Sequence, residues 1–187
     1  GTPEVYGSTG VALFEDAPYS PTTPYAASRA AGDMLIRAYV KAKDFPAITM
    51  RTVNVYGVGQ QLYRIIPKTI LSILAGNRLT LDGGGISTRS FIHIDDASAA
   101  VYLAATRARV GEVYHSSTPR QTSIRGLVQR ICDVMKVEFD DVVSIGPERA
   151  GKDMNYQLES SKLRYETGWH DTVNLEQGID EVIEWMT

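Results

Sequence analysis

The fold of this chain is set by residues 25–43, YAASRAAGDMLIRAYVKAK, and residues 45–53, FPAITMRTV. In the first stretch Met34, Leu35 and Tyr39 recur at helical spacing among charged residues, which predicts a long helix with one apolar face. The second stretch is apolar and partly β-branched, which predicts a buried strand. A long helix that leads directly into a buried strand is typical of α/β sheet proteins.

The same alternation of helical and extended patterns continues to the end of the chain. We predict further helices over residues 65–74, 97–105, 123–136, 160–167 and 175–185, and strands over residues 79–81, 90–94, 112–116 and 142–145. The run Gly83–Gly85 predicts a loop or hairpin, Asp95 and Asp96 predict a helix cap, and Ser123 predicts another. The sequence therefore predicts the α/β class.

Composition excludes several classes of protein. The chain has 187 residues, which corresponds to one domain or to one domain and part of another. Its 19 Lys and Arg against 22 Asp and Glu give a net charge of −3, so no basic excess favours nucleic acid as a partner. No apolar run approaches the ~18 residues of a membrane span, and the first residues do not resemble a signal peptide.

Cysteine and histidine usage indicates a compartment and excludes a metal centre. Cys132 is the only cysteine, so the sequence predicts no disulfide framework and favours the reducing cytoplasm. His93, His115 and His170 lack the spacing of metal ligands, so we expect no metal site.

One expected motif is absent from the sequence. A doubly wound nucleotide-binding domain carries a Gly-rich turn between its first strand and first helix, where backbone amides meet a pyrophosphate. Gly83–Gly85 lies between two predicted strands and precedes no helix, so it does not match that motif.

Several motifs do occur together and in a recognisable order. They are TPEVYG (2–7), SPTTPYAASR (20–29), RTVNVYG (51–57), RIIP (64–67), TRSFIHI (88–94) and ERAGKD (148–153). Together they resemble the extended short-chain dehydrogenase/reductases that modify nucleotide sugars, most closely the dTDP-glucose 4,6-dehydratase group. The resemblance covers essentially the whole chain.

The resemblance implies a division of the chain into two parts. Residues 1–57 would form the C-terminal half of an NAD-binding Rossmann domain, the second half of a doubly wound parallel sheet, whose first half with the Gly-rich loop would precede Gly1. Residues 58–187 would form mainly a small mixed α/β domain that binds the nucleotide sugar, with about 86–120 returning to the Rossmann sheet. We therefore expect the chain to be the C-terminal portion of a longer enzyme, inactive on its own.

The resemblance also assigns the residues that handle the proton lost during oxidation. Tyr25 matches the family's base, and a cation four residues later lies on the same helix face and favours the tyrosinate. The family has a lysine there, which also holds the cofactor's ribose, whereas this chain has Arg29. Arginine stays charged but places its donors differently from an ammonium.

Thr2 and Glu4 match two further groups that act on the sugar. Thr2 corresponds to a hydroxyl that hydrogen-bonds the reacting sugar hydroxyl, and Glu4 to the carboxylate that removes the proton beside the new ketone. The dehydratases place an acid between them, where this chain has Pro3. Either Glu4 also supplies the proton for the departing hydroxyl, or the reaction is not a 4,6-dehydration.

The diphosphate and the base of the substrate have matching positions as well. Asn54, Arg89 and Arg149 stand where the family binds the two phosphates, and arginine suits phosphate because its fork donates two parallel bonds. Asp82 stands where the thymidine-sugar enzymes usually have a tyrosine, so the identity of the base stays open.

The function implied is that of an NAD-dependent enzyme acting on a nucleotide diphosphate sugar in a cytoplasmic homodimer. Retained Glu4 favours 4,6-dehydration or decarboxylation, whereas Pro3 favours a 4-epimerase. The alternative from another class is a non-catalytic sugar-nucleotide-binding or dimerisation module, in which Arg29 and Pro3 mark a lost activity.

Overall fold

The strands of the chain pair mostly in parallel. The computed structural model describes residues 1–148 and 154–187. Three parallel pairs are β2 (Thr49–Thr52) with β6 (Val113–Ser116), β3 (Asn54–Tyr56) with β5 (Thr88–His93), and β4 (Leu79–Asp82) with β8 (Val143–Gly146). A fourth joins β1 (Ala12–Leu13) to β9 (Gln157–Leu158), while β7 (Gln121–Ser123) is antiparallel to β5. Parallel pairs need long connections, which helices supply here, and the predicted α/β class is confirmed.

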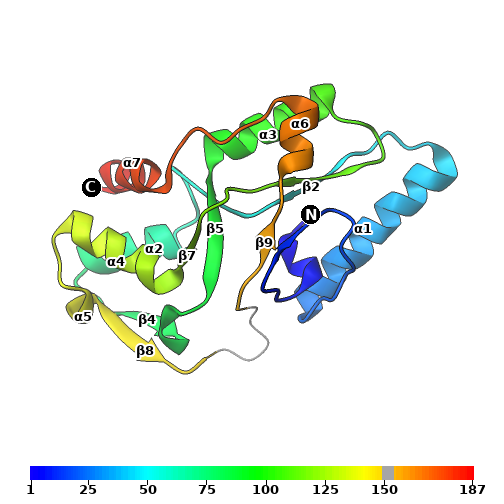
Figure 1. Ribbon diagram of the computed structural model, residues 1–187. Helices are drawn as coiled ribbons and strands as arrows, with labels where there is room; N and C mark the ends of the chain where they lie inside the picture. The colour runs from blue at the N-terminus through cyan, green and yellow to red at the C-terminus, as the bar shows by residue number, and fades with distance from the viewer. Residues whose placement is uncertain (149–153) are drawn as a thin grey trace.

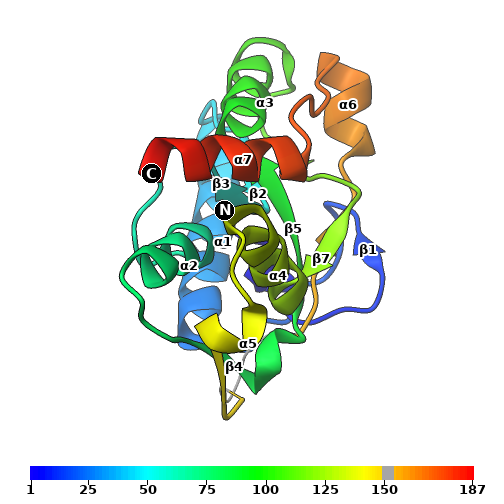
Figure 2. The same cartoon turned by 90° about the vertical axis from the view of Figure 1, so that its left-hand side faces the viewer.

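The helices gather at the two ends of strand β5 and along its sides. They are η1 (Pro3–Tyr6), α1 (Pro24–Lys43), α2 (Ile65–Leu74), η2 (Gly83–Gly85), α3 (Ile94–Arg107), α4 (Ile124–Met135), α5 (Phe139–Val142), α6 (Ser161–Thr167) and α7 (Leu175–Met186). Figure 1 shows α1 and η1 on one side of β5, and α2, α4 and α5 on the other. The view in Figure 2 shows α7 lying across α2 and α4.

Buried side chains form separate apolar clusters on the two sides. One cluster joins η1, β2, β6, α3 and α6 and includes Val5, Tyr114 and Trp169. Another joins α2, α4 and α7 and includes Ile70 and Ile179, and a third lies beneath β4 and β8. Each large aliphatic side chain that is fully buried contributes about 1.5–3 kcal/mol, so burial in these clusters holds the helices on the sheet.

Helix α1 buries a different face from the one that its apolar residues predict. The Thr23 side chain caps it by accepting a hydrogen bond from the Ala26 N–H at 3.1 Å. Its buried positions are Ala26, Ala30 and Asp33. The apolar residues Met34, Leu35 and Tyr39 do not face the core, since they are 56%, 59% and 53% exposed. The small alanines let the helix approach η1 closely, and an ion pair holds Asp33 inside.

The strand predicted over residues 45–53 is in fact two short strands with different partners. Sheet pairing begins at Thr49, because the chain turns at Pro46, where the Ala47 N–H bonds to the Phe45 carbonyl. The Val53 N–H still bonds to the Ser116 carbonyl, and the chain then leaves β6 and pairs with β5 from Asn54 onward. This change of partner brings Asn54 to the edge of a cavity.

Helix α3 begins earlier than predicted and has a different cap. His93 is the N-cap, and its Nδ1 accepts a hydrogen bond from the Asp95 N–H at 3.4 Å, so Asp95 and Asp96 lie in the first turn instead. The Asp96 carboxylate accepts hydrogen bonds from the Thr172 N–H and hydroxyl and from the Val173 N–H at 2.8–3.0 Å. Asp96 therefore anchors the segment that leads into α7. Ser123 caps α4 as expected, since its Oγ accepts from the Gly126 N–H.

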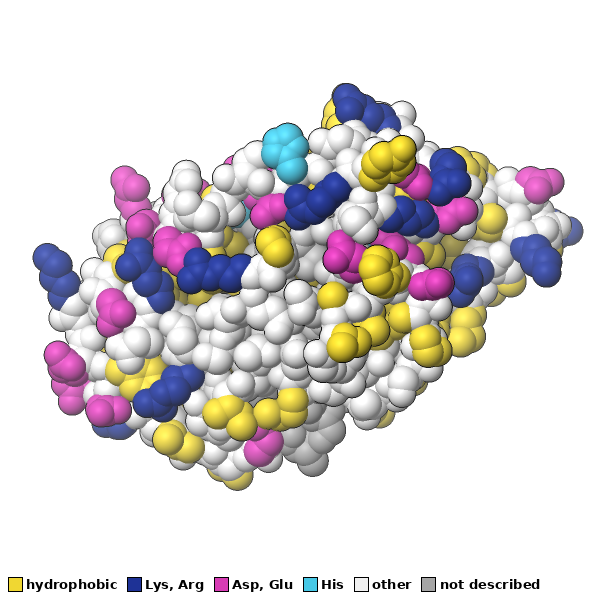
Figure 3. Space-filling view, viewed as in Figure 1, with side chains coloured by type: hydrophobic (Ala, Val, Ile, Leu, Met, Phe, Trp, Pro, Cys, Tyr) yellow, Lys and Arg dark blue, Asp and Glu magenta, His cyan; other side chains and the backbone are white. Residues whose placement is uncertain are grey.

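The surface carries charges of both signs. On the face in Figure 3, Lys and Arg side chains alternate with Asp and Glu. Among the described residues no helix is long and apolar enough to cross a membrane. Over the same residues no group of His, Cys, Asp or Glu is arranged to hold a metal ion.

Candidate functional site

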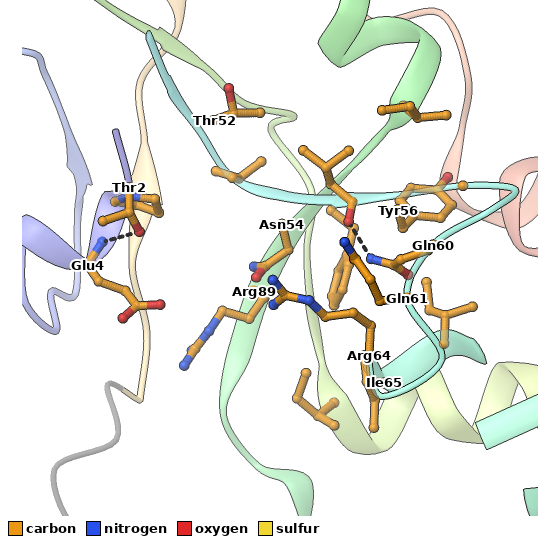
Figure 4. A pocket seen from close by; sticks show the side chains of 18 of the residues that line it. Thr2, Glu4, Thr52, Asn54, Tyr56, Gln60, Gln61, Arg64, Ile65 and Arg89 are labelled. Carbon is orange, nitrogen blue, oxygen red and sulfur yellow. Dashed lines mark hydrogen bonds between the residues drawn. The ribbon is translucent and has the colours of Figure 1, made fainter. Parts of the chain in front are cut away.

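A cavity of about 740 Å³ lies between η1 and α1 on one side and α2 on the other. The structure brings five of the predicted site residues to its walls: Thr2, Glu4, Tyr25, Asn54 and Arg89. Figure 4 shows Thr2 and Glu4 on one side of the cavity, and Asn54, Arg64 and Arg89 facing them. Arg29 does not line the cavity. Arg149 lies outside the described residues.

The first turn of η1 places Thr2 and Glu4 side by side. Thr2 is the N-cap of η1, and its Oγ1 accepts a hydrogen bond from the Glu4 N–H at 3.4 Å. Pro3 fits the first position of this turn because it has no N–H to satisfy. The Thr2 hydroxyl can still donate its own hydrogen, and the Glu4 carboxylate extends into the cavity (Figure 4).

Tyr25 reaches the same cavity from the first turn of α1. Its side chain is 56% exposed and lines the cavity together with Thr2 and Glu4. Arg29 follows one helical turn later and is exposed. The phenol of Tyr25 thus lies at the same cavity as the Thr2 hydroxyl and the Glu4 carboxylate, whereas Arg29 lies outside it.

Asn54 and Arg89 share a partner that sequence reasoning missed. Asn54 Nδ2 donates to the Ser90 carbonyl at 3.2 Å and to the Tyr156 hydroxyl at 3.3 Å. The Arg89 guanidinium lies 4.5 Å from the centre of the Tyr156 ring. Burial raises the pKa of Tyr156, and the charge of Glu4 raises it further. Tyr156 therefore stays a neutral phenol that orients Asn54 and Arg89. No sequence motif marks Tyr156, because it precedes the two-residue strand β9.

Arg64 is a second residue that the sequence did not place at the site. It is the N-cap residue of α2, and Figure 4 shows its side chain crossing the cavity toward Asn54 and Arg89. Gln60, whose Nε2 donates to the Val55 carbonyl at 2.7 Å, folds the loop before α2 back toward β3. Two guanidinium groups at one wall create a positive region that suits a phosphate. In the sequence Arg64 opens the RIIP motif just before a predicted helix, where it could reach a phosphate, but solvated charges are common at helix starts and it was left out of the predicted site.

A buried network fixes η1 and α1 relative to each other. Arg51 is fully buried, and its Nη2 lies 2.8 Å from Asp33 Oδ2 of α1. Its Nη1 donates to the Tyr6 hydroxyl of η1 at 2.6 Å, and Nη2 also donates to the Tyr19 hydroxyl. One guanidinium thus ties together the elements that carry Glu4 and Tyr25.

His115 completes this network as a neutral, buried imidazole. Its ring Nε2 lies 2.9 Å from the Tyr6 hydroxyl, and the backbone N–H of His115 donates to Glu15 Oε1 at 3.0 Å. Burial, aided by the charge of Arg51, lowers the pKa of His115 from 6.5 to about 3. Glu15 accepts from the backbone N–H and has its own pKa raised by burial.

Acid should therefore destabilise the protein through His115. Between pH 6.5 and about 3 the unfolded chain binds a proton at His115 that the folded chain does not. The free energy of unfolding should therefore decrease as the pH is lowered through that window, by up to ~1.4 kcal/mol per pH unit. Urea unfolding of wild type and His115→Gln at pH 7, 6 and 5 checks this, because the variant should have the shallower pH dependence. Both proteins retain Glu15, so the opposite pH dependence that Glu15 contributes to stability cancels in the comparison.

His170→Gln, at an exposed histidine, should keep the pH dependence of the wild type. An equal pH dependence in wild type and His115→Gln would contradict the assignment.

Comparison with known proteins identifies the family. The chain matches the model of the GDP-mannose 4,6 dehydratase family over residues 1–182, and it belongs to that family. A dTDP-glucose 4,6-dehydratase from Haemophilus influenzae is 31% identical over 197 residues, which cover 98% of this chain and 58% of that protein. The expected resemblance is therefore confirmed.

Solved structures agree with this family. A dTDP-glucose 4,6-dehydratase from Streptomyces venezuelae with NAD bound matches at a TM-score of 0.95 and 31% identity, covering 98% of this chain and 57% of that one. A UDP-glucuronic acid 4-epimerase from Bacillus cereus shares the fold at a TM-score of 0.93, with 24% identity over 99% of this chain and 59% of its own. The chain thus spans less than two thirds of the length of these relatives.

Proposed function

We propose that the protein containing this chain is an NAD-dependent 4,6-dehydratase of a nucleotide diphosphate sugar. The observation that carries the proposal is the division of one cavity that Tyr25 also lines: Thr2 and Glu4 lie on one side of it, and Arg64 and Arg89 lie on another. A hydroxyl, a carboxylate and a phenol are the groups needed to move protons on a sugar, and the two guanidinium groups suit its diphosphate.

The residues of this chain fit NAD in part. Tyr25 is exposed at the cavity, where it can contact a bound cofactor and substrate together, and Arg29 lies one turn further along α1. We propose that these two hold the cofactor's ribose. When bound, NAD supplies the acceptor and later the donor of a hydride. A dTDP-glucose 4,6-dehydratase that is 31% identical to this chain was solved with NAD bound, which supports NAD as the cofactor.

Each proton in the reaction has a residue to carry it. Tyr25 takes the proton of the hydroxyl on sugar carbon 4 while Thr2 hydrogen-bonds that oxygen. Glu4 then takes the proton from carbon 5, which the ketone on carbon 4 has made acidic. Because Pro3 carries no proton, Glu4 also returns that proton to the hydroxyl leaving carbon 6, so that one water is lost. Carbon 6 would then receive the hydride held by bound NAD while carbon 5 takes up a proton from water, which balances the proton that Tyr25 releases.

Two features of the surroundings support the rest of the proposal. The division into residues 1–57 for the cofactor and 58–187 for the sugar nucleotide agrees with a cavity that both parts line. The exposed apolar side chains of α1, Met34, Leu35 and Tyr39, support a homodimer through this helix, because burial of such a row is favourable. Arg149 remains a proposed phosphate ligand.

The experiment uses the full-length protein with NAD and a panel of nucleotide diphosphate sugars, and follows product masses. Loss of one water from a single sugar is expected. A product of unchanged mass would favour the epimerase, loss of carbon dioxide the decarboxylase, and binding without turnover the non-catalytic module.

Glu4→Gln sharpens this test. Without the carboxylate the elimination should slow by roughly 10²- to 10⁴-fold, while oxidation at carbon 4 continues. Reduced nicotinamide should then accumulate, which absorbance detects. Glu184→Gln, an exposed position on α7, should behave as wild type. Elimination at the wild-type rate in Glu4→Gln would show that another group is the base.

A further inference from the structure

Two of the polar groups at the cavity take their positions from residues 154–156, the segment that leads into β9. Arg89 Nη1 donates a hydrogen bond to the Met154 carbonyl at 3.1 Å. The same guanidinium packs on the Tyr156 ring, and the Tyr156 hydroxyl accepts from Asn54 Nδ2 at 3.3 Å. Asn54 and Arg89 stand together at one wall of the cavity (Figure 4). A shift of this segment would therefore move both groups.

The backbone of the segment is bound at scattered points. The Thr88 N–H donates to the Met154 carbonyl at 3.0 Å, and the Thr9 N–H donates to the Asn155 carbonyl at 2.9 Å. The two-residue strand β9 begins only after Tyr156. A segment held in this way depends on side chains to keep it in one position.

Gln121 of β7 holds the segment with its side chain. Its Nε2 donates to Asn155 Oδ1 at 2.8 Å and to the Tyr156 carbonyl at 3.1 Å. Because a carbonyl only accepts hydrogen bonds, the amide nitrogen of Gln121 is the atom that faces Tyr156. Gln121 is half-buried and lies opposite Ser90 in the pairing of β5 with β7. One side chain thus fastens Asn155 and Tyr156 to the strand that carries Arg89.

We propose that Gln121 is a positioning residue for the diphosphate of the substrate, an inference that rests on the proposed function. Gln121 does not line the cavity, so it acts on the ligand through Tyr156, which orients Asn54 and Arg89. Groups that are already held in place need less ordering when a ligand binds, which favours affinity. The diphosphate takes no part in the bond changes at the sugar, so its contacts stabilise bound substrate and transition state alike. Loss of the Gln121 bonds should therefore raise KM and leave kcat unchanged.

The test compares wild type with Gln121→Met in the full-length protein. Methionine has about the length of glutamine but donates no hydrogen bond. The affinities for dTDP, UDP and GDP, measured by calorimetry with NAD present, should fall roughly 10-fold for each nucleotide that wild type binds. The affinity for NAD itself should stay at the wild-type value, because Gln121 supports the wall proposed for the phosphates and not the residues proposed for the cofactor. Gln129→Met, at an exposed glutamine whose bond to Asp133 stays within α4, is the matched control.

Gln121→Asn provides a second variant that keeps an amide. Its side chain is one methylene shorter and cannot keep both bonds, so it should show the same selective loss even if Gln121→Met does not fold. Wild-type affinity for the nucleotides in a folded variant, an equal loss for NAD and nucleotides, or a lower kcat at unchanged KM with the sugar that turns over would overturn the role of Gln121 and leave the proposed function standing. Failure of wild type to bind dTDP, UDP and GDP would overturn both.

Discussion

Tyr25→Phe is expected to lower the turnover of the full-length protein by roughly 10²- to 10⁴-fold, the usual contribution of a general base. The substitution removes only the phenolic oxygen, and the ring is already 56% exposed at the cavity. The free energy of unfolding should therefore stay at the wild-type value. Steady-state kinetics together with urea unfolding checks both expectations.

Tyr165→Phe is the matched control, since Tyr165 lies on α6 outside the cavity and is 92% exposed. It should retain wild-type turnover. Equal activity of wild type and Tyr25→Phe would remove Tyr25 from the reaction. Arg29→Lys should raise turnover if the departure from lysine weakens the enzyme, and turnover absent in both forms would favour the non-catalytic module.

Arg51→Met should destabilise the protein by about 3–5 kcal/mol, because it leaves Asp33 buried and unpaired. It also removes the donor to Tyr6. The double variant Arg51→Met/Asp33→Leu should recover much of the loss, since replacing both partners of a buried pair by apolar residues is often neutral. Chemical unfolding of the wild type, both single variants and the double variant completes the cycle.

Arg120→Met provides the control for the loss of an arginine. Arg120 pairs with Glu176 at 2.5 Å, but its side chain is 63% exposed, so solvent screens the pair and little change is expected. If Arg51→Met lowered the free energy of unfolding as little as this control, the network around Arg51 would not be what fixes α1 against η1.

Local patterns predicted the long helices well. Helix α2 was expected over residues 65–74 and occupies Ile65–Leu74, because its apolar residues recur with helical period and Ala75-Gly76-Asn77 stops it. The buried face of α1 does not follow from its apolar pattern. Periodicity identifies an apolar face, but contact with another element decides which face is buried, and here Ala26, Ala30 and Asp33 make that contact.

Short strands and long-range partners could not be predicted in the same way. Strands β1 and β9 have two residues each, and each is a strand only because it pairs with the other. Thr2, Glu4, Tyr25, Asn54 and Arg89 were found because motifs carry them, and the structure gathers them at one cavity. Arg64 was considered as a phosphate contact but left out of the predicted site, and Tyr156 was missed, because their positions depend on how the loop before α2 and the approach to β9 fold.

The pairing of β1 with β9 also determines when the cavity can form during synthesis. Glu4 and Tyr156 line the same cavity but are separated by 156 − 4 = 152 residues. At ~5–20 residues per second, a ribosome needs on the order of 10 s to make the intervening chain. During that interval β1 has no partner, and the apolar side chains of η1 lack part of their cover. Native assembly of the site is therefore a late event, which can be completed only after β9 has been synthesised.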